Sequence, residues 1–273
     1  MHDDPRPRRL HITGAPRSGT TLLHVMVLTC FDIDGPIEAE QRLRRRVPRD
    51  RRLVCSKCPG EVDAAVSILR FAPRLDVIYV ARDPREIVTS EHGAHPGRYF
   101  TNLRVWRRAA RAAARAQGHP RFHVVDYHRL VTQPDAVQAE LMTAMPWLRP
   151  LRPFSQYHLA VRRPNSEWLP AMRQIRPVCP SSLGAWRRHL PRIQGQIRRH
   201  GDLCRDLIAL GYEPDRSWMQ VLDGVEPDLR PSVNAETPSL RRRLKERLPR
   251  LRDIALYVIR NRVPASARLL TQR

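Results

Sequence analysis

A short segment near the N-terminus combines glycine, arginine and hydroxyl side chains at a spacing suited to binding phosphate. It runs from Leu10 to Leu23 and reads as a strand, a glycine-bounded loop and the start of a helix. Glycines let the backbone approach phosphate oxygens, and the free N–H groups at a helix start attract anions. The residues that we expect to contact phosphate here are Gly14, Arg17, Ser18, Gly19, Thr20 and Thr21.

This loop differs from the Walker loop of nucleoside triphosphatases in the position of its cation. The Walker pattern requires lysine after the second glycine, where this chain has Thr20, and the positive charge instead lies within the loop at Arg17. No obvious acidic strand end is present to hold Mg²⁺. The sequence therefore predicts a nucleotide phosphate bound without an obligatory metal ion, and no metal site is expected.

A second group of polar residues follows a later strand. Arg82 comes directly after the apolar run Val77 to Ala81, and Ser90 lies eight residues further on. An arginine at the carboxyl end of a strand can bind a phosphate through two parallel hydrogen bonds, and a serine two helical turns away can donate to the same group. These two residues predict a second phosphate site.

Apolar runs that alternate with helical patterns predict an α/β fold. Four short runs read as buried parallel strands and the segments between them as crossover helices, so ligands are expected beyond the carboxyl ends of the strands. The predicted strands are residues 10–13, 53–55, 77–81 and 122–125. The predicted helices are residues 20–31, 61–71, about 102–116, 135–145, 182–199 and 202–210.

Composition indicates a globular and strongly basic chain. It has 273 residues, 41% of them hydrophobic, and a formal net charge of +22. Such a charge could serve a protein that binds nucleic acid, and this remains an alternative function. However, aromatic residues make up only 6% of the chain and no known nucleic-acid module is present, so no specific nucleic acid is expected.

The C-terminal part of the chain differs from the rest. A stretch rich in Pro, Asp, Glu and Ser predicts a linker at 223–237, between a main domain at 1–222 and a tail at 238–273. In the tail, Leu240, Leu244, Leu248, Leu251, Ile254, Ala255 and Val258 recur at helical spacing, with a kink expected at Pro249. A basic amphipathic helix can lie on an anionic membrane, dock on an acidic partner or fold back on its own domain.

The cysteines and the N-terminal residues indicate the cellular compartment in which we expect the protein. Five scattered cysteines favour free thiols over a disulfide framework. Cys55 and Cys58 form a CxxC pair that fits two small residues of a buried strand. The alternative roles for this pair are metal binding and redox chemistry. Because the N-terminus lacks a signal-peptide pattern, we expect a cytoplasmic protein, with 238–273 as its one candidate for membrane association.

The phosphate loop and the motif from Arg82 to Ser90 resemble the 5′-phosphosulfate and 3′-phosphate motifs of sulfotransferases that use 3′-phosphoadenosine 5′-phosphosulfate (PAPS). Two further segments are similar to motifs of this family, one from Val124 to Pro134 and the other around Trp186. The resemblance covers about residues 9 to 213. It implies a P-loop-type sulfotransferase fold, PAPS as donor and no required metal.

Within this family, the local likeness is closest to tyrosylprotein sulfotransferases. Their catalytic glutamate lies 21 residues after the loop arginine, a register that falls on Glu38, and their catalytic lysine segment resembles the surroundings of Lys57. The same resemblance assigns Tyr127 and Arg176 to the nucleotide. The chain departs from the family pattern in two places, with Ala94 where an arginine is usual and His128 in place of a glutamate.

The resemblance implies sulfuryl transfer to an acceptor hydroxyl by in-line displacement. Glu38 is then the general base, and Lys57 and Arg17 stabilise the developing charge. Other residues that could act as the base are Glu40, Glu91 and His92. The candidate acceptors are a peptidyl tyrosine, including one in an acidic peptide, and a hydroxyl of a glycan, lipid or small molecule. A P-loop kinase-like enzyme remains a further alternative.

Overall fold

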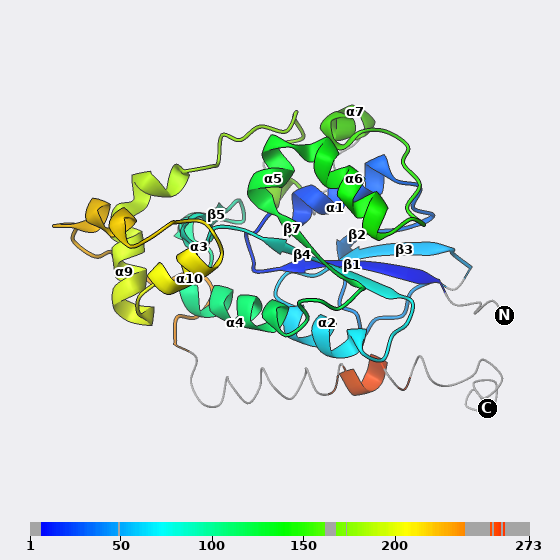
Figure 1. Ribbon diagram of the computed structural model, residues 1–273, viewed down its shortest axis with the longest axis horizontal. Helices are drawn as coiled ribbons and strands as arrows, with labels where there is room; N and C mark the ends of the chain where they lie inside the picture. The colour runs from blue at the N-terminus through cyan, green and yellow to red at the C-terminus, as the bar shows by residue number, and fades with distance from the viewer. Residues whose placement is uncertain are drawn as a thin grey trace.

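The chain forms a parallel five-stranded sheet between two layers of helices (Figure 1). The computed structural model describes residues 7–48, 50–161, 168–172, 174–237, 252, 254–257 and 259. The strand order is β2-β3-β1-β4-β7, and every pair of neighbours is parallel. The strands are β1 (Arg8–Gly14), β2 (Gly35–Glu40), β3 (Leu53–Lys57), β4 (Leu75–Ala81) and β7 (Phe122–Asp126). The predicted α/β class and all four predicted strands are confirmed.

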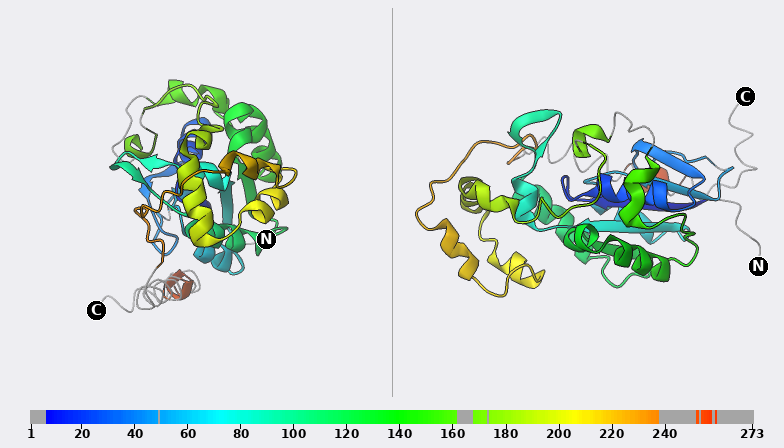
Figure 2. Two further views of the ribbon diagram at one scale, coloured as in Figure 1. Left: turned by 90° about the vertical axis from the view of Figure 1, so that its left-hand side faces the viewer. Right: turned by 90° about the horizontal axis from the view of Figure 1, so that it is seen from above.

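The helices divide between the two faces of the sheet (Figure 1). One face carries α1 (Thr20–Cys30), α5 (Tyr127–Thr132), α6 (Pro134–Ala144) and α7 (Tyr157–Ala160), and the other carries α2 (Val62–Leu69) and α4 (Leu103–Ala114). The other helices are α3 (Pro84–Val88), α8 (Leu169–Met172), α9 (Leu190–His200) and α10 (Cys204–Ala209), with 3₁₀ turns at Phe154–Gln156, Ala185–His189 and Ser217–Leu222. Figure 2 shows that α9 and α10 lie beyond one end of the sheet.

Strand β4 shows why these sequences form a central sheet. Leu75, Val77 and Tyr79 pack into the core under α2 and α4, whereas Ile78 and Val80 pack under α1. A strand covered on both faces reads as a continuous apolar run, and that pattern made β4 predictable. Helix α4 has one buried side, and Asn102 caps its start because its side chain accepts from the backbone N–H of Val105 at 3.1 Å.

Some elements were not predicted. Strand β2 reads Gly-Pro-Ile-Glu-Ala-Glu and is largely exposed at the sheet edge, so it has no apolar run to reveal it. A short antiparallel hairpin, β5 (Glu91–His92) and β6 (His95–Tyr99), is mostly polar. The predicted helix at 182–199 is instead a 3₁₀ turn followed by α9. Proline is favoured in the first turn of an α-helix, and Pro191 is the second residue of α9.

The segment predicted as a linker contains buried polar residues. Ser232 and Glu236 are 4% and 7% exposed. The Glu236 carboxylate accepts hydrogen bonds from Gln196 and His200 of α9 and from Ser232. The backbone N–H of Val233 donates to Tyr99, which attaches this stretch to β6. We call residues 228–236 the strap. The division into domains at 223–237 stays a prediction.

The described part of the tail is helical at residues 254–257 and lies beside α2 (Figure 1). Tyr257 is 9% exposed and belongs to the core cluster that α2 and α4 form, and Ile254 packs against the same cluster. This contact supports folding back for these residues. The tail positions Leu240, Leu244, Leu248, Pro249, Leu251 and Val258 lie outside the described residues. Binding of the tail to a membrane or to an acidic partner stays a prediction.

Candidate active site

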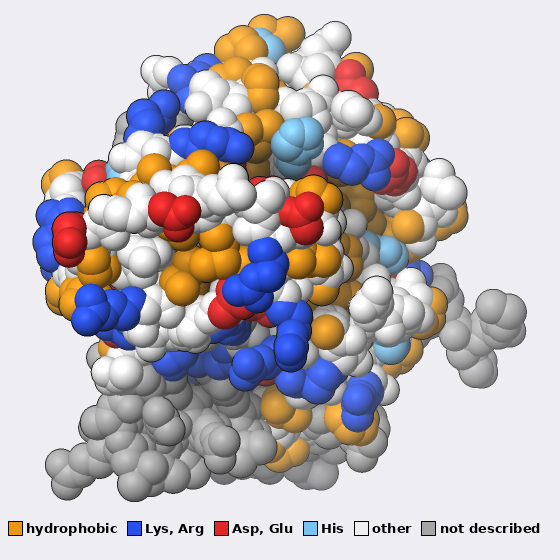
Figure 3. Space-filling view, turned by 60° about the vertical axis from the view of Figure 1, so that its left-hand side comes forward, with side chains coloured by type: hydrophobic (Ala, Val, Ile, Leu, Met, Phe, Trp, Pro, Cys, Tyr) orange, Lys and Arg blue, Asp and Glu red, His pale blue; other side chains and the backbone are white. Residues whose placement is uncertain are grey.

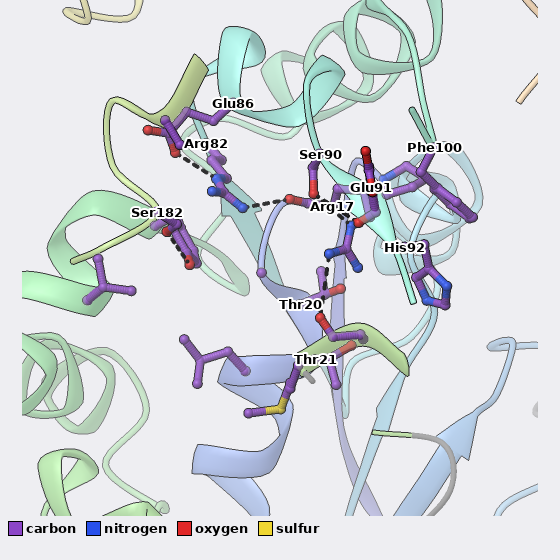
Figure 4. Close-up of a pocket in the computed structure, with 18 of the residues that line it drawn as sticks. Arg17, Thr20, Thr21, Arg82, Glu86, Ser90, Glu91, His92, Phe100 and Ser182 are labelled. Carbon is purple, nitrogen blue, oxygen red and sulfur yellow. Dashed lines mark hydrogen bonds and ion pairs between the residues drawn. The ribbon is translucent and has the colours of Figure 1, made fainter. Parts of the chain in front are cut away.

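A pocket of about 720 Å³ opens beyond the carboxyl ends of the central strands, where the fold predicts a ligand. Its walls come from the start of α1, from α3, from the β5–β6 hairpin, from α5 and from residues 171–189 (Figure 4). On the face seen in Figure 3, basic and acidic side chains are interspersed. The residues predicted to bind substrate that line this pocket are Arg17, Gly19, Thr20, Thr21, Arg82, Ser90, Tyr127 and Arg176.

The loop between β1 and α1 requires its two glycines. A Cβ at Gly14 would lie 2.5 Å from the Ser18 hydroxyl and 2.9 Å from the Val80 carbonyl oxygen. Gly19 has a φ of +99°, and a Cβ there would lie 2.5 Å from Cε2 of the Tyr127 ring. Other parts of the chain therefore approach these two positions too closely for any residue larger than glycine.

Two further features of this loop fit an anionic ligand. The Ser18 hydroxyl is buried and has no hydrogen-bond partner among the residues that the structure describes, although such groups are normally paired. Arg17 has a φ of +74°, and it is the one residue other than glycine with a positive φ within the described ranges. Strained backbone of this kind concentrates at functional sites, so the loop is shaped for a ligand rather than for its own packing.

The two motifs separated by more than 60 residues meet in this pocket (Figure 4). The Arg17 Nε donates to the Ser90 hydroxyl at 3.0 Å, and the Arg82 Nη1 donates to the Arg17 carbonyl oxygen at 3.0 Å. Arg82 also donates to Glu86 at 2.9 Å, and its guanidinium lies 4.0 Å from the centre of the Tyr127 ring. Two guanidinium groups therefore line one wall of the pocket.

The residues predicted to contact the nucleotide come from separate segments of the chain. The Tyr127 hydroxyl is 3.1 Å from the Ser182 hydroxyl. Arg176 lines the pocket, and its backbone carbonyl accepts a hydrogen bond from Tyr157 at 2.8 Å. Glu86 accepts from the Gly184 N–H at 2.7 Å and so connects the Arg82 wall to the segment that contains Ser182. Sequence reasoning missed Glu86, although its position four residues after Arg82 on a helix was a usable signal.

Lys57 lies at the end of β3 and reaches the phosphate loop. Its side chain is 3% exposed, and Nζ is 3.1 Å from the Thr21 hydroxyl and 3.0 Å from Glu40 Oε1. The pairing of β2 with β3 sets Glu40 opposite Lys57. A buried ammonium group thus bridges a carboxylate and the residues expected to hold phosphate, which is where charge would develop in a group transfer.

The carboxylates considered as the base occupy different places. Glu40 and Glu91 line the pocket, as does His92. Glu38 is exposed on β2 outside the pocket lining, and its backbone carbonyl accepts from the Trp168 indole N–H at 3.3 Å. The role of Glu38 stays a prediction from the register of the family motif. Other lining residues that the sequence gave no means to find include Phe100, Ser182 and Asn234.

The remaining cysteine and metal predictions concern residues away from this chemistry. Cys55 and Cys58 are both free thiols. Burial raises the pKa of both thiols, that of Cys58 to about 12, so neither is a ready nucleophile or metal ligand. Among the residues that the structure describes, no group of three or more His, Cys, Asp and Glu side chains could hold a metal ion.

None of the described helices is long and apolar enough to cross a membrane.

Fold and site together define an α/β enzyme with a pocket for an anionic nucleotide. Residues 37–146 of the chain match the model of the sulfotransferase family. The matched range begins after the phosphate loop and includes β3, β4, the Arg82 motif and β7. No curated protein matches the chain.

Three solved structures show distant likeness. The sulfotransferase domain of the Synechococcus PCC 7002 olefin synthase is 18% identical, with 68% of this chain and 89% of that chain covered and a TM-score of 0.48. The sulfotransferase domain of the curacin biosynthetic pathway is 16% identical, with 66% of this chain and 90% of that chain covered and a TM-score of 0.45. Retinol dehydratase, in complex with androsterone and inactive cofactor PAP, is 13% identical, with 60% of this chain and 66% of that chain covered and a TM-score of 0.34. We infer nothing about substrates from likeness at this level.

Proposed function

We propose that this sulfotransferase moves the sulfuryl group of PAPS to an aromatic hydroxyl. The observation that carries the donor assignment is that two anion-binding motifs share one pocket, with the Arg17 side chain hydrogen-bonded to Ser90 and the Arg82 side chain to the backbone of Arg17. A donor with phosphate groups at both its 5′ and its 3′ positions would need two such motifs. A nucleoside triphosphate would instead need lysine at the position of Thr20.

The residues of the pocket fit this donor. The loop from Gly14 to Gly19, with the unpaired Ser18 hydroxyl, would hold the 5′-phosphosulfate. Arg82 and Ser90 would hold the 3′-phosphate, and Tyr127 and Arg176 would contact the nucleoside. The donor supplies an activated sulfuryl group and a bisphosphate leaving group, and the side chains described next supply the proton acceptor and the positive charge.

We assign the proton transfer to Glu40 because of its place in the pocket. Glu40 lines the cavity, and its carboxylate lies 3.0 Å from Lys57 Nζ. A carboxylate at this position can accept the proton of an acceptor hydroxyl as its oxygen attacks the sulfur. Lys57 Nζ then stabilises the charge that develops between the sulfuryl oxygens and the leaving phosphate, together with Arg17.

The acceptor side of the pocket favours an aromatic substrate. His92 and Phe100 line it, and their ring centroids lie 5.0 Å apart with an interplanar angle of 34°. A flat phenolic ring would pack against these two rings better than a sugar ring would, because aromatic pairs gain contact area and favourable ring geometry. A peptidyl tyrosine is one such acceptor. Glycan and lipid hydroxyls are the competing acceptors.

An acceptor screen with sulfur-labelled PAPS tests this proposal. We expect label transfer to a phenol such as a tyrosine-containing peptide, in the presence of EDTA, and little transfer to matched peptides with serine or phenylalanine in place of tyrosine. A preference for sugar or aliphatic hydroxyls would overturn the aromatic assignment alone. Failure to use PAPS with any acceptor would overturn the donor assignment.

A further inference from the structure

His92 lies two residues after Ser90 of the second motif and lines the part of the pocket that we assign to the acceptor. It ends β5, and the backbone N–H of Phe100 donates to the Ser90 carbonyl at 3.0 Å, which closes the hairpin behind it. His92 lines the pocket and its ring packs on Phe100 (Figure 4). The sequence makes it one of several residues able to act as the base, and the structure allows a narrower assignment.

One hydrogen bond determines which ring nitrogen of His92 can donate. The backbone N–H of Ala94 donates to His92 Nδ1 at 3.2 Å. Since Nδ1 accepts, it carries a lone pair, and the proton of the neutral ring must reside on Nε2. In this tautomer Nε2 is a donor, so it cannot accept the proton of a substrate hydroxyl.

The surroundings of His92 keep the ring neutral. Burial lowers the pKa of His92, and the positive charges of Arg17 and Lys57, together with nearby His95, lower it further. Glu40 acts in the opposite direction without reversing the shift. At neutral pH the side chain is therefore an uncharged imidazole with one available N–H. His92 lines the same pocket as Arg17 and Glu40, the residues to which we assign the transferring group and the proton.

We propose that His92 is a catalytic hydrogen-bond donor, whose Nε2–H binds an oxygen of the transferring sulfuryl group, and not the general base. The inference rests on the proposed sulfuryl transfer. In the reaction the acceptor oxygen forms a bond to sulfur while the bond from sulfur to the phosphate oxygen breaks. The acceptor proton goes to the Glu40 carboxylate, and the His92 proton stays on Nε2. A fixed donor of this kind acts where charge develops.

Paired substitutions separate a donor from a base. His92→Gln keeps an N–H donor near the position of Nε2, whereas His92→Ala removes it. We expect turnover to fall about ten- to a hundredfold in His92→Ala, the effect of one hydrogen bond to a charged group, and to recover most of that loss in His92→Gln. Affinity for adenosine 3′,5′-bisphosphate should stay unchanged in both. His95→Gln, one strand further along, is the matched control and should keep near-normal turnover.

The pH dependence of kcat/KM gives a readout that a merely structural role would not move. The groups facing His92 are Arg17, Lys57, Glu40 and His95. If Glu40 is the base, the acidic limb of the profile persists in His92→Gln. If His92 were the base, both variants would lose roughly 10² to 10⁴ in turnover and the limb would vanish, which would overturn the proposal.

Nitrogen NMR of the histidines tests the tautomer without any activity measurement. The chain has 11 histidines, and comparison with His92→Gln assigns the signals of His92. We expect an unprotonated Nδ1 and a protonated Nε2 at neutral pH. A protonated Nδ1 would overturn the proposal even in an inactive preparation. Absence of PAPS turnover in the wild-type protein, with the expected tautomer present, would instead count against the proposed function.

Discussion

The two sides of the pocket are built by different means. The side that we assign to the donor combines the loop after β1, where Gly14 and Ser18 are buried, with the side chains of Arg17, Arg82 and Ser90. The acceptor side consists of side chains on the edge strand β2 and on a two-stranded hairpin, both largely exposed. The donor site therefore depends on the core of the fold, whereas the acceptor site can change its residues without disturbing that core.

This difference predicts that substitutions on the two sides have separable effects. A substitution on the donor side changes packing against the central strands and should affect binding of the nucleotide. A substitution on the acceptor side should leave the nucleotide bound and change turnover or acceptor choice. Each of the following variants tests whether the two sides are independent in this way.

The largest effect is expected for the carboxylate of the acceptor side. Glu40→Gln keeps the shape of the side chain but removes the proton acceptor, so turnover should fall by roughly 10² to 10⁴ with bisphosphate affinity unchanged. Glu38→Gln, two residues earlier on the same strand, is the matched control and should turn over nearly normally. Steady-state kinetics with a phenolic acceptor measure both. The reverse pattern would restore Glu38 as the base and contradict our assignment.

A large effect is also expected for the loop of the donor side. In Gly19→Ala the new methyl group would collide with the Tyr127 ring, and the φ of +99° would strain the backbone. We expect bisphosphate affinity to fall at least about a hundredfold, a loss of about 2.7 kcal/mol that one such collision can account for. Calorimetric titration measures this affinity.

The control for this variant carries backbone strain without a collision. Gly118 has a φ of +83°, and a Cβ there would meet nothing within 4 Å. Gly118→Ala should lower stability slightly and leave bisphosphate affinity intact. Equal affinities in the two alanine variants would show that the loop beside Tyr127 does not contact the ligand.

The smallest effect on the pocket, but a clear one on stability, is expected at the strap. Burial acts to raise the pKa of Glu236, but hydrogen bonds from His200, Ser232 and Gln196 outweigh it and lower the pKa to about 2. A carboxyl group with a pKa lower in the folded than in the unfolded state stabilises the fold above pH 4 to 5. That contribution is lost as the pH falls toward about 2.

Glu236→Gln removes this charge from a buried cluster that includes Arg192, which donates to Glu236 at 3.3 Å. We expect a loss of about 3 kcal/mol in the free energy of unfolding at pH 7, measured by denaturant titration, and a smaller loss near pH 2.5. Glu140→Gln, in an exposed ion pair with Arg129, should change stability little. An unchanged stability of Glu236→Gln at both pH values would contradict the role of the cluster.

The same strap variant compares the two sides of the pocket. Strap residues Val233 and Asn234 donate backbone hydrogen bonds to Tyr99 and Phe100, next to the acceptor side. Loosening the strap should therefore raise the KM for the acceptor more than the KM for PAPS. An effect confined to PAPS would show that the strap supports the donor side instead.

The donor side could be predicted from the sequence because its signals are local. Strands β1 and β4 are apolar runs buried on both faces, and each is followed at once by the residues that face the ligand. The positions of Arg17 and Arg82 in the fold can therefore be predicted from the apolar runs that precede them. Parallel strands bring such residues to the same edge of the sheet, so their meeting in one pocket also followed from the pattern.

The acceptor side could not be predicted in the same way. Strand β2 lies at an edge and has few apolar residues, so nothing in its sequence indicated that Glu40 would lie opposite Lys57. Phe100 and Asn234 are 134 residues apart along the chain and meet only through tertiary packing. A single sequence carries no record of such contacts. The register of a family motif favoured Glu38 over Glu40 as the base, and only the pairing of β2 with β3 shows that Glu40 lies opposite Lys57.

The most direct test of the donor site is thermal unfolding of the purified protein in EDTA with adenosine 3′,5′-bisphosphate, with ADP and with neither. A ligand at a hundred times its dissociation constant adds about 2.7 kcal/mol, which is a readily measured shift. We predict stabilisation by the bisphosphate, little by ADP, and a much smaller bisphosphate shift in Arg82→Ala. No shift, or equal shifts with both nucleotides, would contradict a donor site specific for PAPS.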